Sequence, residues 1–170
     1  MVGGTDARIR VVDVDTGRTI RHQTLDSTFY TSTTTTSSKS IKPAQESTII
    51  WDIIVLRDGT TVSADSTGAV SFWHGPSGTL IKKFTLHKAD ALCLAQSRDG
   101  SRVFSSGSDR NVIQYSFIET KSKTSSTRKH EWIVTGEKRY HSHDVYTMLY
   151  HQVLLTCCII TLVSIRVWIR

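Results

Sequence analysis

The feature that most constrains this chain is a pattern that occurs twice between residues 57 and 115. Each copy begins with an Asp-Gly pair, at Asp58-Gly59 and Asp99-Gly100, and these pairs lie 41 positions apart. Each copy ends in an aromatic residue, Trp73 or Tyr115, and these two lie 42 positions apart. A sequence that repeats at a fixed period builds its fold from one repeated unit.

This period predicts the fold class. Repeats of about 40 to 45 residues with several short strands per unit are typical of an all-β WD40-type β-propeller, in which four-stranded blades surround a channel. Propellers contain about 4 to 8 blades, whereas 170 residues leave room for at most four units. We therefore expect a partial propeller, with about three to four blades of a larger ring, over residues 3–150.

Turn residues and β-branched runs place the blades. They predict blade remnants at residues 3–25, 48–86, 87–135 and 141–150. The first remnant places Val12 where the repeat has Trp73, so we expect the chain to start inside a blade. In the second, the near-continuous apolar run 48–56 predicts a buried central strand.

Two polar segments interrupt the blades. Residues 26–47 are rich in Ser and Thr, which predicts a flexible insertion between blades. Residues 120–131 form a basic polar insertion that we interpret as a loop, and no aromatic residue is interleaved among its cations to stack on a single strand. Its candidate phosphate contacts are Lys121, Lys123, Arg128 and Lys129. A solvated loop without a partner is the alternative.

The apolar C-terminus, residues 151–170, is atypical of the repeat. Its run from Val153 to Ile165 contains 13 residues, fewer than the roughly 18 needed for a transmembrane helix. We expect either two buried strands or a terminus foreign to the repeat, and we expect no membrane partner. A membrane-tethered form is the less favoured alternative.

Composition restricts the function further. A net charge of +6 permits an acidic partner such as RNA, but it also fits a mildly basic solvated surface. The three cysteines include no C-x-x-C pair, so the sequence predicts neither a zinc site nor a disulfide framework. Phosphate-binding Gly-rich loops and hydrolase motifs are lacking from the sequence. We expect no enzyme activity, no cofactor and no small-molecule substrate.

Two His-x-x-Asp pairs, His87 with Asp90 and His141 with Asp144, invite a catalytic or metal-binding interpretation. Neither pair has a nucleophile or third ligand at a suitable spacing, so we favour a structural role. The units resemble WD repeats, in which a His, a Ser or Thr, an Asp and a Trp form a hydrogen-bond network. This resemblance assigns the structural network to His87, Ser105, Asp109, Tyr115, Trp73 and His141.

The resemblance also implies that this network is uneven. In the third unit Tyr115 stands where the Trp usually stands, so the network is altered there. In the second unit Trp73 is present, but Thr67 replaces the turn Asp and no His precedes Ile49. We therefore expect the rigidity of the second unit to come mainly from packing.

Several sequence segments indicate a particular family more specifically than the generic repeat does. They occupy residues 47–51, 55–60, 63–73, 87–95, 103–110 and 139–145. Together they resemble the cirhin family, WD-repeat subunits of the nucleolar small-subunit processome. The resemblance covers residues 3–150, is strongest over 47–118, and does not extend to 152–170.

The resemblance implies a non-catalytic scaffold in the nucleus and nucleolus. Its partners would be other processome proteins and the pre-rRNA ribonucleoprotein, and its role would be in ribosome biogenesis, supporting pre-rRNA transcription and processing of the pre-18S rRNA. The resemblance is compatible both with direct RNA contact and with contact through other proteins. The alternative is a generic WD40 adaptor for protein complexes, for example in ubiquitin ligation or trafficking.

Overall fold

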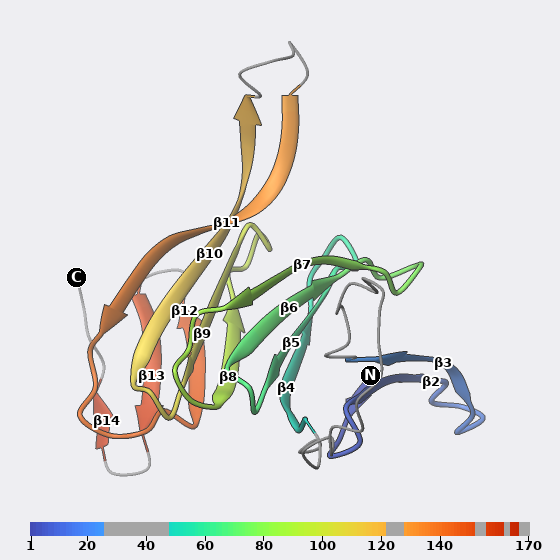
Figure 1. Ribbon diagram of the computed structural model, residues 1–170, viewed down its shortest axis with the longest axis horizontal. Coiled ribbons are helices and arrows are strands. Elements are labelled where there is room, and N and C mark those ends of the chain that lie inside the picture. Colours follow the sequence, from blue (N-terminus) through green and yellow to red (C-terminus); the bar gives the residue numbers. More distant parts are fainter. Residues whose placement is uncertain (26–47, 122–127, 152–155, 162–163, 167–170) are drawn as a thin grey trace, which may run out of the picture. The chain divides into compact units, whose positions relative to one another are not determined.

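The computed structural model describes residues 1–25, 48–121, 128–151, 156–161 and 164–166 (Figure 1). Within these ranges the chain forms strands and turns and contains no helix. It divides into two compact units, Met1–Ile50 and Trp51–Arg170. The predicted insertion at 26–47 lies outside the described residues.

The first unit contains one antiparallel sheet of three strands in the order β1-β2-β3. The strands are β1 (Val2–Gly3), β2 (Arg8–Val12) and β3 (Thr19–Thr24). Ile9 on β2 is fully buried. The turn between β2 and β3 is closed by a hydrogen bond of 2.9 Å from the Gly17 amide to the Asp13 carbonyl.

The second sheet has four strands in the order β4-β5-β6-β7. They are β4 (Ile50–Val55), β5 (Thr61–Asp65), β6 (Ala69–Trp73) and β7 (Leu80–Thr85). Every residue of β5 and β6 is buried. On β4, however, Trp51 and Val55 are 46% and 45% exposed. The prediction of a buried central strand at 48–56 was therefore wrong, because β4 lies at the edge of the order β4-β5-β6-β7.

The third sheet repeats this arrangement in the order β11-β10-β9-β8. Its strands are β8 (Ala91–Gln96), β9 (Arg102–Gly107), β10 (Asn111–Lys121) and β11 (Arg128–Arg139). Val103 pairs with Tyr115 here, as Thr61 pairs with Trp73 in the second sheet. The 42-residue offset of the sequence is thus kept in the pairing of the strands.

The Asp-Gly turns provide a second correspondence between these sheets. Gly59 and Gly100 adopt φ of 85° and 75°, a conformation that costs glycine little because it has no Cβ. In the second turn, hydrogen bonds from the Ser97 and Ser101 hydroxyls lower the pKa of Asp99 to about 2. The Asp99 carboxylate is thereby kept ionised to hold the turn.

The fourth sheet has three strands in the order β12-β13-β14, paired antiparallel. They are β12 (Thr147–His151), β13 (Thr156–Thr161) and β14 (Ser164–Arg166). The described part of the apolar run 153–165 therefore forms strands. In the described ranges we find no helix with the length and apolar character needed to cross a membrane.

Two apolar clusters join the sheets of the second unit. The larger lies between the second and third sheets, and its buried members are Leu56, Val62, Ala64, Val70, Phe72, Ala91, Leu94, Val103, Ile113, Tyr115 and Trp132. The smaller joins the third sheet to β12 and the segment before it through Cys93, Ala95, Phe104, Val112, Val145 and Met148. Each sheet thus buries apolar surface against its neighbours, as in repeat proteins.

The basic segment 120–131 differs from its expected conformation. Strands β10 and β11 continue into it, so that Thr120 pairs with Lys129 and Lys121 with Arg128. A two-stranded ladder satisfies backbone hydrogen bonds even where the side chains are polar. The prediction of a loop was therefore wrong for residues 120–121 and 128–131, which form a long hairpin instead (Figure 1).

The close approach of strands at Gly107 generates a testable prediction. A Cβ at this position would lie 1.9 Å from the Asp90 carbonyl oxygen, whereas one at Gly136 would meet nothing closer than the Gln114 Cβ at 3.8 Å. We expect Gly107→Ala to lower the free energy of unfolding by about 2 to 3 kcal/mol, because backbone must move to admit the methyl group. The matched control Gly136→Ala should change it by about 0.5 kcal/mol or less.

Urea denaturation followed by far-ultraviolet circular dichroism measures both values. Equal midpoints for the two variants would contradict the packing described for Gly107.

Candidate functional site

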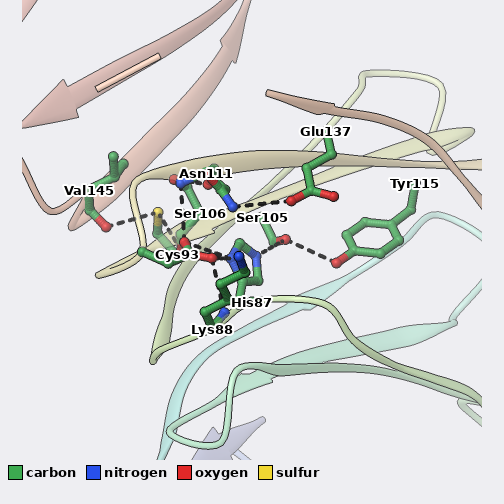
Figure 2. Close-up of polar contacts among 10 residues, drawn as sticks. His87, Lys88, Cys93, Ser105, Ser106, Asn111, Tyr115, Glu137 and Val145 are labelled. Atoms are coloured by element: carbon green, nitrogen blue, oxygen red, sulfur yellow. Dashed lines mark hydrogen bonds and ion pairs between the residues drawn. The ribbon is translucent and has the colours of Figure 1, made fainter. Parts of the chain in front are cut away.

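A continuous chain of polar side chains joins the segment before β8 to β9, the β9–β10 turn and β10 (Figure 2). His87 precedes β8, Ser105 lies on β9, Asp109 lies in the β9–β10 turn and Tyr115 lies on β10. The His87 Nδ1 lies 3.0 Å from both Asp109 carboxylate oxygens, and its Nε2 lies 2.7 Å from the Ser105 Oγ. The Tyr115 hydroxyl lies 3.2 Å from the same Ser105 Oγ.

The chemistry of these groups gives the hydrogen bonds a direction. A carboxylate only accepts, so the His87 Nδ1 donates to Asp109. With a neutral imidazole, Nε2 accepts from the Ser105 hydroxyl, which in turn accepts from Tyr115. Burial raises the pKa of the Tyr115 hydroxyl far above its usual value. Tyr115 therefore stays a donor throughout the neutral range.

Ser105, His87 and Asp109 have the connectivity of a hydrolase triad, but their surroundings do not suit that chemistry. Ser105 is fully buried and His87 is 5% exposed. The Tyr115 hydroxyl also contacts the Ser105 oxygen that would have to attack a substrate. This geometry stabilises the meeting point of the strands and offers no access for a substrate.

Asp109 also holds the backbone around it. Its carboxylate accepts hydrogen bonds from the amides of Lys88 at 3.2 Å and Asn111 at 3.1 Å. Asp90, the acid suggested by the His-x-x-Asp spacing, instead accepts a bond of 3.1 Å from the Trp51 indole nitrogen. The three-residue spacing thus does not reflect a pair, whereas the 22-residue separation from His87 to Asp109 does.

The second sheet contains part of the same network. The Trp73 indole nitrogen donates to the Ser63 Oγ at 3.0 Å, in a buried position. Asp65, which is 1% exposed, accepts from the Thr67 amide at 2.8 Å and the Ala69 amide at 3.2 Å. We expected the rigidity of this unit to come mainly from packing, because Thr67 stands where the turn Asp is usual. This expectation needs correction, because the Asp65 carboxylate, two positions before Thr67, holds the turn by hydrogen bonds.

Ser63 and Asp65 are residues that the sequence interpretation missed. A signal for Ser63 was available, since it precedes Ser105 by the same 42 positions that separate Trp73 from Tyr115. Asp65 corresponds by that offset to Gly107, so the repeat gave no indication of it.

His141 does not form the corresponding contacts in the fourth unit. Among the described residues, its Nε2 is buried without a hydrogen-bond partner. At the spacings that separate His87 from Ser105 and Asp109, the chain carries Ile159 and Val163 after His141. Burial lowers the pKa of His141, because desolvation penalises its charged form.

The candidate phosphate contacts lie at the end of the β10–β11 hairpin. Lys121 and Arg128 are register partners, and Lys129 is next to them on β11. Lys123 lies outside the described residues. The ring of His130 stacks on Phe117 at a centroid distance of 5.5 Å, an aromatic contact that the sequence interpretation missed because Phe117 precedes the basic segment.

Metal binding has no support in the described ranges, where no group of three or more His, Cys, Asp or Glu side chains could hold an ion. Cys93 is buried, and its Sγ lies 3.6 Å from the carbonyl oxygens of Ser106 and Val145. This thiol therefore belongs to the packing between the third sheet and β12.

Sequence comparison finds similarity to proteins named for their association with U3 small nucleolar RNA. It is 52% identical over 103 residues to U3 small nucleolar RNA-associated protein 4 of Schizosaccharomyces pombe and 35% identical over 112 residues to the Saccharomyces cerevisiae protein of that name. These matches cover 61% and 65% of this chain but 13% and 14% of the relatives. U3 small nucleolar RNA-associated protein 4 is also called cirhin. No protein-family model matches the chain.

Comparison with solved structures shows the fold. The structure of U3-55K and that of the RRP9 WD40 repeats each match with a TM-score of 0.63 at 17% and 16% identity, covering 92% of this chain and 40% and 39% of theirs. The WD40 β-propeller domain of Doa1 matches with a TM-score of 0.61 at 13% identity, covering 92% of this chain and 41% of its own. The chain thus has a partial WD40-type β-propeller fold, which confirms the predicted fold class.

The first prediction from this site concerns His87. We expect His87→Ala to lower the free energy of unfolding by about 3 kcal/mol, because it leaves the buried Ser105 hydroxyl and the Asp109 carboxylate without their common partner. His74 is exposed and bonds locally to Ser77, so His74→Ala is the matched control, with an expected loss of about 0.5 kcal/mol or less. Chemical denaturation measures both.

A double-mutant cycle refines this test. His87→Ala and Asp109→Ala together should cost less than the sum of the single changes, because both remove the same hydrogen bond. Strict additivity would show that the two side chains do not interact.

The second prediction concerns pH and His141. Its pKa is lowered in the folded state, so below a pH of about 6.5 the unfolded chain takes up the proton first and stability falls. The His141→Gln variant lacks this titration. We therefore expect wild type to lose more unfolding free energy than the variant between about pH 7 and pH 5. Parallel pH dependences in urea melts would contradict the burial of this imidazole.

Proposed function

We propose that this chain belongs to the cirhin family and acts as a non-catalytic WD-repeat scaffold in assembly of the small-subunit processome. The observation that carries this proposal is the 52% identity over 103 residues to U3 small nucleolar RNA-associated protein 4. The chain spans less than a fifth of the length of such relatives, so the role of a whole protein is inferred from one region. Processing of the pre-18S rRNA is the step in ribosome biogenesis that we assign to it.

The physical character of the fold supports a scaffold. The side chains with the chemistry of a triad are buried and mutually hydrogen-bonded, so they stabilise the sheet and do not act on a substrate. Strands held in this way present their turns and hairpins on a rigid base, which lowers the entropic cost of binding. The partners we propose are other processome proteins and the pre-rRNA ribonucleoprotein, within the nucleolus.

A generic WD40 adaptor in ubiquitin ligation or trafficking would have the same fold. The similarity to the Doa1 domain, at 13% identity, shows the fold alone and does not distinguish an adaptor from a nucleolar scaffold. Sequence identity favours the nucleolar scaffold, because the relatives at 52% and 35% identity share one name.

Affinity purification from cells tests the proposal. The tagged protein should co-purify with U3 small nucleolar RNA, identified by sequencing, and with processome proteins, identified by mass spectrometry. The matched control is the tagged Doa1 WD40 domain, which shares the fold but lacks the sequence relationship. Enrichment of ubiquitin-ligase or trafficking proteins, with U3 RNA no higher than in the control, would overturn the assignment.

A further inference from the structure

The segment that joins β11 to β12, residues 140–146, presents an exposed serine beside an arginine of a neighbouring turn. The segment lies outside the strands. Ser142 is exposed, and its hydroxyl oxygen lies 2.9 Å from the Nδ1 of the next residue, His143. Its backbone carbonyl accepts a hydrogen bond of 3.2 Å from the Nη1 of Arg110, which lies in the β9–β10 turn. The Ser142 hydroxyl is thus accessible from solvent and close to a guanidinium.

Arg110 has more hydrogen-bonding capacity than its contacts use. A guanidinium carries five N–H donors. The Nη1 of Arg110 bonds to the Ser142 carbonyl, whereas its Nε is buried without a hydrogen-bond partner among the described residues. A buried donor without a partner costs stability. An additional anionic acceptor at this guanidinium would therefore be favourable.

Arg139 supplies a second cation three positions before Ser142. It is the last residue of β11 and the register partner of Asn111, which directly follows Arg110. Its side chain is exposed and, in the described part of the chain, forms no hydrogen bond or ion pair. An arginine at this spacing before a serine is a charge pattern that suits a protein kinase with an acidic substrate groove.

The carboxylates near this segment leave most of that positive charge in place. Glu137 accepts a hydrogen bond of 3.1 Å from the Asn111 side chain, and Asp109 is held by His87 at 3.0 Å. Asp144 lies two positions after Ser142 and has no ion-pair partner in the described ranges. Its single negative charge opposes a further anion, but the two guanidinium groups outweigh it.

Other hydroxyls also follow an arginine by three positions, which provides an internal comparison. In the described ranges these are Thr24, Thr60, Ser101 and Ser105. Thr60 and Ser105 are buried. Thr24 is paired within the β2–β3 ladder, and the Ser101 hydroxyl donates to the Asp99 carboxylate at 2.7 Å. Of these five hydroxyls, the one on Ser142 combines exposure with a position outside the strands and beside a cation.

We propose that Ser142 is a phosphorylation site of a basophilic protein kinase, and that its phosphate joins residues 140–146 to the β9–β10 turn through Arg110. The Ser142 Oγ attacks the γ-phosphorus of ATP held by the kinase, and the bond from that phosphorus to the β–γ bridging oxygen breaks. ADP leaves, and the hydroxyl proton passes to the catalytic carboxylate of the kinase.

The phosphate supplies what the guanidinium lacks. A phosphoserine carries about −1.5 to −2 charges at pH 7 and three strong acceptor oxygens. A guanidinium and a phosphate form charge-assisted and often bidentate hydrogen bonds. The inference does not depend on the proposed function, because it uses only the contacts and charges around this segment.

Incubation of the purified 170-residue chain with the catalytic subunit of protein kinase A and Mg-ATP tests the modification. Peptide mass spectrometry should locate phosphate on Ser142, with Ser101 modified more slowly. Arg139→Ala should lower the rate at Ser142 by about 10-fold or more, the effect of one hydrogen-bonded charge. The matched control is Arg98→Ala, which removes the arginine three positions before Ser101 and should leave the Ser142 rate unchanged.

Hydrogen exchange tests the contact with Arg110. The Val145 amide donates to the Gly107 carbonyl at 3.2 Å, so its exchange reports the opening of residues 140–146. Phosphorylation should slow this exchange between about 10-fold and 150-fold, the range for one charge-assisted hydrogen bond. Arg110→Asn removes the guanidinium but tolerates the φ of 67° at this position, and it should abolish the slowing.

The control for charge is Lys88→Asn, which removes an exposed cation and should leave the slowing unchanged. Absence of phosphate from Ser142, faster modification of Ser101, or an unchanged rate in Arg139→Ala would overturn the assignment of the site. Equal slowing of Val145 exchange in wild type and Arg110→Asn would overturn the contact with Arg110.

Discussion

The stacking of Phe72 on Trp132, at a centroid distance of 4.5 Å, exemplifies the constraint on which the second unit depends. The rings belong to neighbouring sheets, and neither sheet buries its apolar residues without the other. Burial of such a side chain stabilises the folded state by about 1.5 to 3 kcal/mol. Stability in this architecture therefore arises mainly between adjacent sheets, as it does in repeat proteins generally.

Polar groups inside this packing make the arrangement specific. A buried hydroxyl or imidazole costs stability unless each hydrogen-bonding atom has a partner. His87, Ser105 and Tyr115 meet this requirement by bonding to one another. The Asp109 carboxylate accepts from His87 and from a backbone amide of the turn. The chain of bonds joins the segment before β8 to β9 and β10. The hydrogen bonds that hold these strands together also occupy the polar atoms of the buried side chains. These atoms are therefore not available to react with a molecule in solution, which suits a scaffold.

The β10–β11 hairpin connects this rigid interior to the surface. Trp132 at its base belongs to the core, while Phe117 farther along is substantially exposed. The ladder continues through Lys121 and Arg128, so the backbone at these two positions is paired.

Sequence reasoning was most successful where a feature is local or periodic. The period predicted the propeller because each unit must present the same turns and strands to its neighbours. The separation of His87 from Asp109 followed from likeness to WD repeats. The buried carboxylate of Asp65 could not be anticipated, because its position matches a glycine in the next unit. His141 was assigned to a network whose partner positions carry Ile159 and Val163.

The all-β class, the repeated register and the residues available for hydrogen bonding could be predicted from the amino-acid sequence, since they depend on local pattern and on a fixed period. That residues 120–121 and 128–131 are paired strands, and that Phe117 stacks on His130, became visible in the three-dimensional structure. Those properties depend on which residues face one another across the hairpin, and its register is tied to the packing of Trp132 on Phe72 of the neighbouring sheet.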